Sequence, residues 1–212
     1  MARGRRRVED PATARRILAA AEQHFAAQGL AGARTEEIAM AAHANKAMLY
    51  YYFGNKRRLH RAVLENLLRQ LRAAVFSVPK KGRSPREKFF AQVSGYFDFL
   101  ATHPNYPRLV QRQAMEPGRG FEWMVTEFFR PLYREFARMV EEGIAQGEFR
   151  AVDPDQTASI TVQMTTSYFA ANAILSRVVG RDLLAPEAVA ARKRALLDFL
   201  EHAIAREGAS PR

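Results

Sequence analysis

The sequence predicts an all-α protein with a small N-terminal and a larger C-terminal helical part, and three observations support this. Apolar residues recur along most of the chain at the three- and four-residue spacing of amphipathic helices. Capping residues and first-turn prolines separate these stretches, and no stretch has the strict alternation or the β-branched run of a strand. The chain has 212 residues, 48% of them hydrophobic, which is enough to bury a sizeable core.

Positive charge is concentrated near the N-terminus. The first 61 residues hold 12 Lys and Arg against 5 Asp and Glu, a net charge of +7. The remaining 151 hold 21 against 17, a net charge of +4. Such a patch attracts nucleic acid through the release of phosphate counterions. A basic helix on a membrane surface is the competing interpretation, but the apolar stretch Tyr50–Phe53 after Lys46 is too short for it.

The composition argues against an enzyme. The chain lacks cysteine, which excludes disulfides and thiolate metal sites and fits a cytoplasmic protein. We expect no signal peptide, membrane span, metal or cofactor, because the corresponding sequence patterns are absent. The distant alternative is a helical hydrolase or isomerase that uses His103 and Glu116, which flank a proline-rich break, although ordinary helix-end residues are commoner.

A basic arm, residues 1 to 9, precedes the first predicted helix. It contains Arg3, Arg5, Arg6 and Arg7. It either contacts phosphates or a minor groove, or is a solvated terminus, and the sequence leaves both open. Asp10 and Pro11 then predict the cap and first turn of a helix that runs to Gln28 and ends at Gly29.

Residues 34 to 56 predict two short helices joined by a tight turn. Thr35 is the expected N-cap of the first, followed by Glu36 and Glu37 at the positive end of the helix dipole. After a break at His43, Asn45 is the expected N-cap of the second helix, Lys46 to Tyr52, which Gly54 ends. Small alanines along both helices allow the close crossing of a helix-turn-helix.

These residues resemble the DNA-binding signature of the tetracycline-repressor-like (TetR) family. The matching positions are Thr35, Ile38, Ala39, Ala42, Lys46, Ala47, Leu49, Tyr50, Tyr52, Phe53, Lys56 and Leu59. The resemblance covers about the first third of the chain and implies an all-helical homodimeric regulator whose C-terminal domain binds a small ligand. His43 replaces a usual turn glycine and is expected to strain the turn, while Met48 replaces a small or hydroxyl residue and is expected to alter base preference.

The predicted DNA-binding residues divide by role. Lys46, Ala47 and Met48 occupy the first turn of the second helix, where a helix-turn-helix reaches base edges in the major groove of double-stranded DNA. By the family resemblance, four further residues should hold phosphates, and Tyr50 should either pack or contact DNA. The four are Thr35, Tyr51, Tyr52 and Lys56.

The rest of the chain predicts six further helices, for about nine in all. They lie at about residues 55 to 76, 86 to 103, 108 to 115, 121 to 146 with a kink at Pro131, 154 to 179 and 186 to 206. We expect a DNA-binding domain at residues 10 to 58, a ligand-binding and dimerisation domain at 59 to 206, and a tail at 207 to 212.

The aromatic and Met-rich middle of the chain is either core or the lining of a cavity. The family resemblance favours a cavity for a small apolar or aromatic ligand. The expected lining residues are Phe90, Phe97, Met115, Trp123, Met124, Phe128, Met164 and Tyr168.

The last two predicted helices are apolar on more than one side, which indicates a four-helix dimer interface. The expected contact residues are Met164, Ala171, Leu175, Leu196, Leu200 and Ile204. The sequence therefore predicts a dimeric repressor that a ligand releases from its operator, with a DNA-binding regulator that lacks an effector as the alternative.

Overall fold

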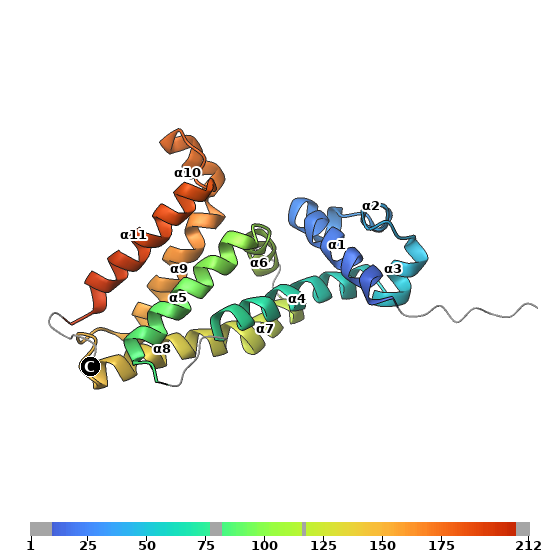
Figure 1. Ribbon diagram of the computed structural model, residues 1–212. Coiled ribbons are helices and arrows are strands. Elements are labelled where there is room, and N and C mark those ends of the chain that lie inside the picture. Colours follow the sequence, from blue (N-terminus) through green and yellow to red (C-terminus); the bar gives the residue numbers. More distant parts are fainter. Residues whose placement is uncertain (1–9, 77–81, 116–117, 207–212) are drawn as a thin grey trace, which may run out of the picture. The chain divides into compact units, whose positions relative to one another are not determined.

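The computed structural model describes residues 10–76, 82–115 and 118–206, in which the regular elements are helices joined by short loops (Figure 1). They form two compact units, of which the first ends at Asn66 and the second begins at Leu67. No helix within the described ranges is long and apolar enough to cross a membrane. The basic arm and the tail lie outside the described residues, as does Glu116 of the expected His103–Glu116 pair.

The first unit packs three helices against the beginning of a fourth. These are α1 (Pro11–Gly32), α2 (Thr35–Ala41), α3 (Lys46–Phe53) and α4 (Lys56–Phe76). The core side chains are fully buried, with Ile17 and Phe25 from α1, Ile38 from α2, Leu49 from α3 and Leu59 from α4. A small unit depends on such a shared centre because each helix alone buries too little apolar surface to be stable.

The caps of the first unit agree with the sequence except at Thr35. Asp10 accepts from the Ala12 N–H, and Asn45 accepts from the Met48 N–H, as expected of N-caps. Arg34, not Thr35, is the N-cap residue of α2, and its side chain makes no capping bond. Thr35 instead turns inward and is 7% exposed, because the helix begins one residue earlier than a hydroxyl cap requires.

The turn between α2 and α3 is held by two backbone hydrogen bonds around His43. The His43 N–H donates to the Met40 carbonyl at 3.0 Å, and the Ala44 N–H donates to the Ala39 carbonyl at 2.9 Å. This pair of hydrogen bonds is the pattern of a Schellman motif, which requires a left-handed residue at its centre. His43 adopts a φ of 50°, at a conformational cost that glycine avoids. The expectation of strain at His43 is therefore supported by its backbone.

The second unit is a bundle around α5 (Pro85–Thr102), α8 (Arg130–Ala145) and α9 (Pro154–Ala170). The remaining elements are α6 (Tyr106–Met115), α7 (Arg119–Met124), the π-helix η1 (Val125–Phe129), α10 (Asn172–Val179) and α11 (Pro186–Ile204). Phe89 lies at the centre of one end, in edge contact with Phe136 at 5.9 Å and with Phe149 at 5.7 Å between ring centroids. These aromatic contacts fix α5 against α8 and the segment before α9.

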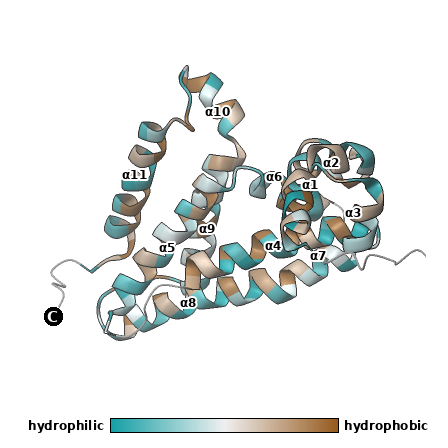
Figure 2. Cartoon of the chain, turned by 45° about the vertical axis from the view of Figure 1, so that its right-hand side comes forward, coloured by the Kyte–Doolittle hydropathy of each residue, from teal (hydrophilic) through white to brown (hydrophobic). Residues whose placement is uncertain are grey.

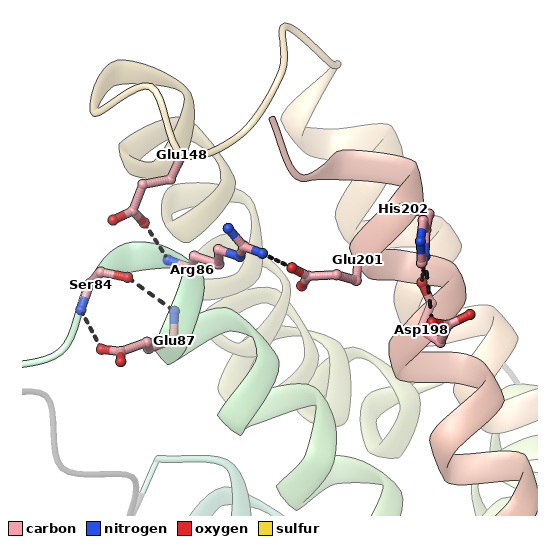
Figure 3. Close-up of polar contacts among 7 residues, drawn as sticks. All are labelled: Ser84, Arg86, Glu87, Glu148, Asp198, Glu201 and His202. Carbon is pink, nitrogen blue, oxygen red and sulfur yellow. Dashed lines mark hydrogen bonds and ion pairs between the residues drawn. The ribbon is translucent and has the colours of Figure 1, made fainter. Parts of the chain in front are cut away.

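Polar contacts close that end of the bundle (Figure 3). Ser84 and Glu87 form a capping box at the start of α5, and the Arg86 N–H donates to the Glu148 carboxylate at 2.8 Å. The Arg86 guanidinium forms an ion pair with Glu201 of α11. An isolated antiparallel bridge between Phe149 and Ala205 lies at the same end. The end of α11 is thereby attached to both α5 and the α8–α9 loop.

Two predicted helices differ from the structure. The helix expected from 154 to 179 is broken at Ala171, which ends α9, and α10 begins at Asn172. At the break, Ala171 has a non-helical ψ of 7°. The sequence does not predict this turn, because alanine is a strong helix former. The distortion expected at Pro131 takes the form of the π-helix η1, because proline offers no N–H to the carbonyl four residues before it.

The strain at His43 should appear as a change in the free energy of unfolding when His43 is replaced. We expect His43→Gly to raise the free energy of unfolding by about 1 kcal/mol, because glycine adopts a positive φ without a Cβ clash. Ala44→Gly is the matched control, and it should lower stability by about 0.5–1 kcal/mol, because Ala44 does not have a positive φ. Urea unfolding of the two variants tests this, and a loss of stability in both would show that the turn is not strained.

Candidate nucleic-acid interface

The recognition helix α3 presents most of its surface to solvent. Only Leu49 of its eight residues is buried. Lys46 and Ala47 are exposed at its first turn, and Met48 is half-buried beside them. Tyr50 and Tyr51 are also exposed, at 39% and 63%. The expected base-contacting residues are thus grouped on one accessible turn, whose placement follows from the Asn45 cap and the burial of Leu49.

Lys46 is held by α2. Its ammonium forms an ion pair with the Glu36 carboxylate and lies 5.8 Å from the centroid of the Tyr50 ring. The hydrogen bond from Lys46 lowers the pKa of Glu36 from 4.5 to about 2, and the same bond raises the pKa of Lys46. Both groups are therefore charged at neutral pH. The sequence indicates only a helix-dipole role for Glu36, because a separation of ten positions has no helical or strand periodicity that would predict its contact with Lys46.

Two of the expected phosphate-contacting residues form hydrogen bonds with backbone groups of the same chain. The Tyr52 hydroxyl accepts from the Asp10 N–H at 3.0 Å and donates to the Asp10 carbonyl at 3.2 Å. The Lys56 ammonium donates to the Ala31 carbonyl at 3.0 Å. Tyr52 thus anchors the start of α1. Lys56 retains two further N–H donors, because an ammonium has three.

Arg16 also supports the helix-turn-helix, which the sequence did not indicate. Its Nε donates to the Ala42 carbonyl at 3.2 Å, and an Nη donates to the Thr13 hydroxyl at 2.7 Å. Ala42 is the C-cap residue of α2, where unpaired carbonyls carry the negative end of the helix dipole. Arg16 therefore links α1 to the turn between α2 and α3.

The described residues of the second unit line several hollows. One, of about 490 Å³, is lined by Gln70, Gly95 and His103 among others, and two more lie beside α8. The larger of these two, about 520 Å³, lies between α4 and the η1–α8 segment and includes Leu71, Arg72 and Phe128 in its lining. The smaller, about 290 Å³, lies among α5, α6, α8 and α9 and includes Tyr96, Val110 and Val162. Leu132 lines both. The two cavities therefore lie on either side of the first turn of α8.

Of the eight expected ligand-lining residues, only Phe128 lines one of these two cavities. Phe97 and Tyr168 are buried in core stacking with ring centroids 6.5 Å apart, and Met124 is fully buried. Phe90 packs on Phe89 and Phe149, Trp123 packs on Phe128, and Met164 is half-buried. Met115 is 81% exposed.

For the other seven residues, a place in the lining of a ligand cavity stays a prediction. The side chains of Phe97, Met124 and Tyr168 fill space between helices, while aromatic residues outside the expected set, such as Tyr96 and Phe129, line the smaller cavity.

The expected dimer residues need correction. Leu196, Leu200 and Ile204 are at most 4% exposed, because this stripe of α11 faces the bundle of its own chain. Phe199, which lies beside this stripe on α11, is 56% exposed, and Ile160 of α9 is 50% exposed. Leu175 is 37% exposed, while Met164 and Ala171 are half-buried. Figure 2 shows hydrophobic and hydrophilic stretches alternating along α11.

Comparisons with known proteins agree with this architecture. Residues 17–63 match the family model "Bacterial regulatory proteins, tetR family", and residues 85–200 match "Tetracyclin repressor-like, C-terminal domain". The chain belongs to the TetR family of transcriptional regulators. The first match contains the helix-turn-helix, and the second spans more than half of the chain.

Three relatives place this TetR-family chain among known proteins. The HTH-type transcriptional repressor SCO4008 of Streptomyces coelicolor is 38% identical over 51% of this chain and 54% of its own length, so the chain spans about half of that relative. The putative transcriptional regulator SCO4942 of the same species is 25% identical, with a TM-score of 0.70 over 91% of this chain and 98% of that one. AibR, solved with isovaleryl coenzyme A and operator DNA, is 17% identical with a TM-score of 0.73, over 88% and 97%. This last likeness shows the fold alone.

The division of the interface into base and phosphate contacts predicts different effects for two lysines. Removing the Lys56 charge should weaken binding to all DNA sequences alike and reduce the salt slope by about one unit. Lys46→Ala should cost roughly 1–3 kcal/mol on the preferred operator and much less on random DNA. Salt titrations of both variants on both DNAs give the measurement. The opposite pattern would show that α3 docks differently.

Proposed function

We propose that this chain is a homodimeric, sequence-specific DNA-binding repressor that acts in the cytoplasm and leaves its operator when a small, largely apolar ligand binds. The observation that carries the proposal is the exposed first turn of α3, with Lys46 projecting from a helix-turn-helix held by the Asn45 cap and the His43 turn. The positive charge of the first 61 residues supplies the sequence-independent part of the affinity.

The chemistry of the smaller cavity favours an uncharged ligand. No charged side chain is among the residues that line it, and Gln111, Gln163 and Thr166 contribute its polar groups together with tyrosines. The hydroxyls of Tyr96 and Thr166 hydrogen-bond each other at 2.6 Å, and burial raises the pKa of Tyr96 to about 12. These hydroxyls are satisfied and neutral, so the cavity offers mainly apolar contact.

The larger cavity connects ligand binding to α4. Leu68, Leu71 and Phe76 of α4 line it, and α4 begins at Lys56, two residues after Gly54 ends the recognition helix. A ligand that fits one position of α4 better than another shifts the population of that position. Operator affinity then changes by the difference in ligand affinity between the two states. The operator and ligand named for AibR support this proposal by fold alone.

The alternative is a DNA-binding regulator without an effector. The two proposals share the DNA-binding unit and differ only in the second unit. A cavity of about 290 Å³ lined mainly by carbon favours the ligand-responsive form, because packed interiors rarely leave such a volume empty.

The dimer proposal now rests on Ile160 and Phe199. Helices α9 and α11 are antiparallel neighbours, because Phe149 before α9 pairs with Ala205 after α11, and the Tyr168 hydroxyl donates to the Leu183 carbonyl at 2.5 Å near the other ends. Ile160 and Phe199 therefore lie at similar heights on the two helices, and both are about half-exposed. A second copy related by a two-fold axis would cover both.

The ligand proposal predicts the behaviour of a variant that fills the smaller cavity. We expect N-phenyl-1-naphthylamine, an uncharged aromatic dye, to bind the protein with a rise in fluorescence. Val162→Trp should reduce its affinity at least about ten-fold, because the indole occupies the cavity. Arg134→Trp is the control, since Arg134 is exposed and lines neither of the two cavities. Equal dye binding by all three proteins would contradict the assignment.

The dimer proposal predicts that charge at Phe199 separates the subunits. Phe199→Lys should weaken association at least about a hundred-fold, because each copy then buries an unpaired ammonium near the two-fold axis. Operator affinity should fall with it, while Phe199→Leu keeps the apolar contact and should remain a dimer. Sedimentation velocity and operator binding measure both effects. A Phe199→Lys dimer with full operator affinity would exclude this face.

A further inference from the structure

The ion pair between Glu36 and Lys46 joins the first turns of α2 and α3. The Glu36 side chain is 61% exposed and that of Lys46 is 49% exposed. Water can therefore solvate each charge without help from the other. An exposed ion pair of this kind contributes little to stability, because water and salt screen it and two long side chains lose freedom. The dipole of α2 also favours a carboxylate in its first turn, but Glu37 provides one there as well, so helix stability does not require the contact of Glu36 with Lys46.

The position of Glu36 is unusual for a surface that contacts DNA. Lys46 lies on the turn of α3 that enters the major groove in a helix-turn-helix. Because the Glu36 carboxylate contacts the Lys46 ammonium, it reaches the same part of the groove. Phosphates and most base-edge atoms there repel a carboxylate, whereas the amino groups of cytosine and adenine are donors to it.

We propose that Glu36 and Lys46 together recognise one G·C base pair, with Lys46 donating to guanine O6 or N7 and Glu36 accepting from cytosine N4. This rests on the proposed function, because it requires α3 to enter the major groove. The G·C pair presents the O6 acceptor and the N4 donor side by side. The ion pair presents a donor and an acceptor side by side, so the two patterns are complementary.

The neighbouring Glu37 has a different environment. Its carboxylate lies 3.9 Å from Arg34 and 3.8 Å from His24 Nδ1, and no contact with Lys46 is present among the described residues. Glu36 remains ionised because the bond from Lys46 lowers its pKa to about 2. The two adjacent glutamates thus carry the same charge on the same helical turn, and only Glu36 is paired with Lys46. Glu37→Ala is therefore a matched control for Glu36→Ala.

The first experiment is a binding selection on randomised duplex DNA with the full chain and three variants. The unchanged protein should select a G·C pair that Lys46→Ala no longer selects. Glu36→Ala should lose roughly ten-fold of the preference at that same pair. Glu37→Ala should keep the preference, and both glutamate variants should bind random DNA more tightly because each removes one negative charge.

A second experiment separates direct contact from positioning of Lys46. The selected cytosine is replaced by 2-pyrimidinone, which has hydrogen in place of the 4-amino group. The replacement should lower the affinity of the unchanged protein roughly ten-fold more than it lowers the affinity of Glu36→Ala. The reason is that only the unchanged protein loses a contact with the 4-amino group. Equal losses would overturn the direct contact.

The selection also has outcomes that contradict the inference. If Glu36→Ala keeps the preference as Glu37→Ala does, or loses it at a different base pair from Lys46→Ala, the joint recognition is wrong. If the unchanged protein selects no sequence at all, the proposed function fails instead. The two failures are therefore distinguishable.

Discussion

The turn around His43 is the constraint on which the DNA-binding unit depends. Its two backbone hydrogen bonds end α2, and only a left-handed residue at its centre allows the chain to reverse within so few residues. Asn45 then starts α3 by capping the Met48 N–H. The crossing of the two helices brings Glu36 and Lys46 into contact, although ten residues separate them. A histidine at this turn sacrifices some stability while keeping the required backbone.

The second unit depends on threonines that satisfy their own hydroxyls. Thr157, Thr161 and Thr165 of α9 are buried, and each donates to the carbonyl four residues earlier at 2.7 Å. A hydroxyl paired in this way enters the core without leaving an unsatisfied polar group. Helix α9 therefore buries a threonine face, and the apolar Ile160 faces solvent. Because the threonines take the buried positions, the apolar Ile160 is left on the exposed side of α9, at the level of Phe199 on α11.

The η1 segment contributes lining residues to both of the cavities beside α8. Phe128 lines the larger cavity and Phe129 the smaller, although they are consecutive in the chain. Consecutive side chains of a helical segment point about 100° apart, so Phe128 and Phe129 reach different sides of the helix that follows. Leu132, one residue after Pro131, separates the two spaces. A ligand in either cavity therefore contacts the same short segment, and in the larger cavity it also contacts α4.

The sequence by itself determined the features that depend on local chemistry. The helical class, the Asp10, Asn45, Ser84 and Asp153 caps, and the positive φ at Gly54 are settled by side chains within four residues of the backbone they satisfy. The family signature is equally local, because most of its residues lie within two adjacent helices.

Tertiary structure decided which face of each helix is buried and which distant residues meet. Periodicity places Leu196 and Leu200 on one stripe but does not say whether that stripe faces its own chain or a second copy. Only packing against α5 and α9 settles that question. The same holds for the contact of Glu36 with Lys46 and for the cavities, which are the spaces that large side chains such as Phe97 leave unfilled. Burial and long-range contact are properties of the assembled helices, so no single stretch of sequence contains them.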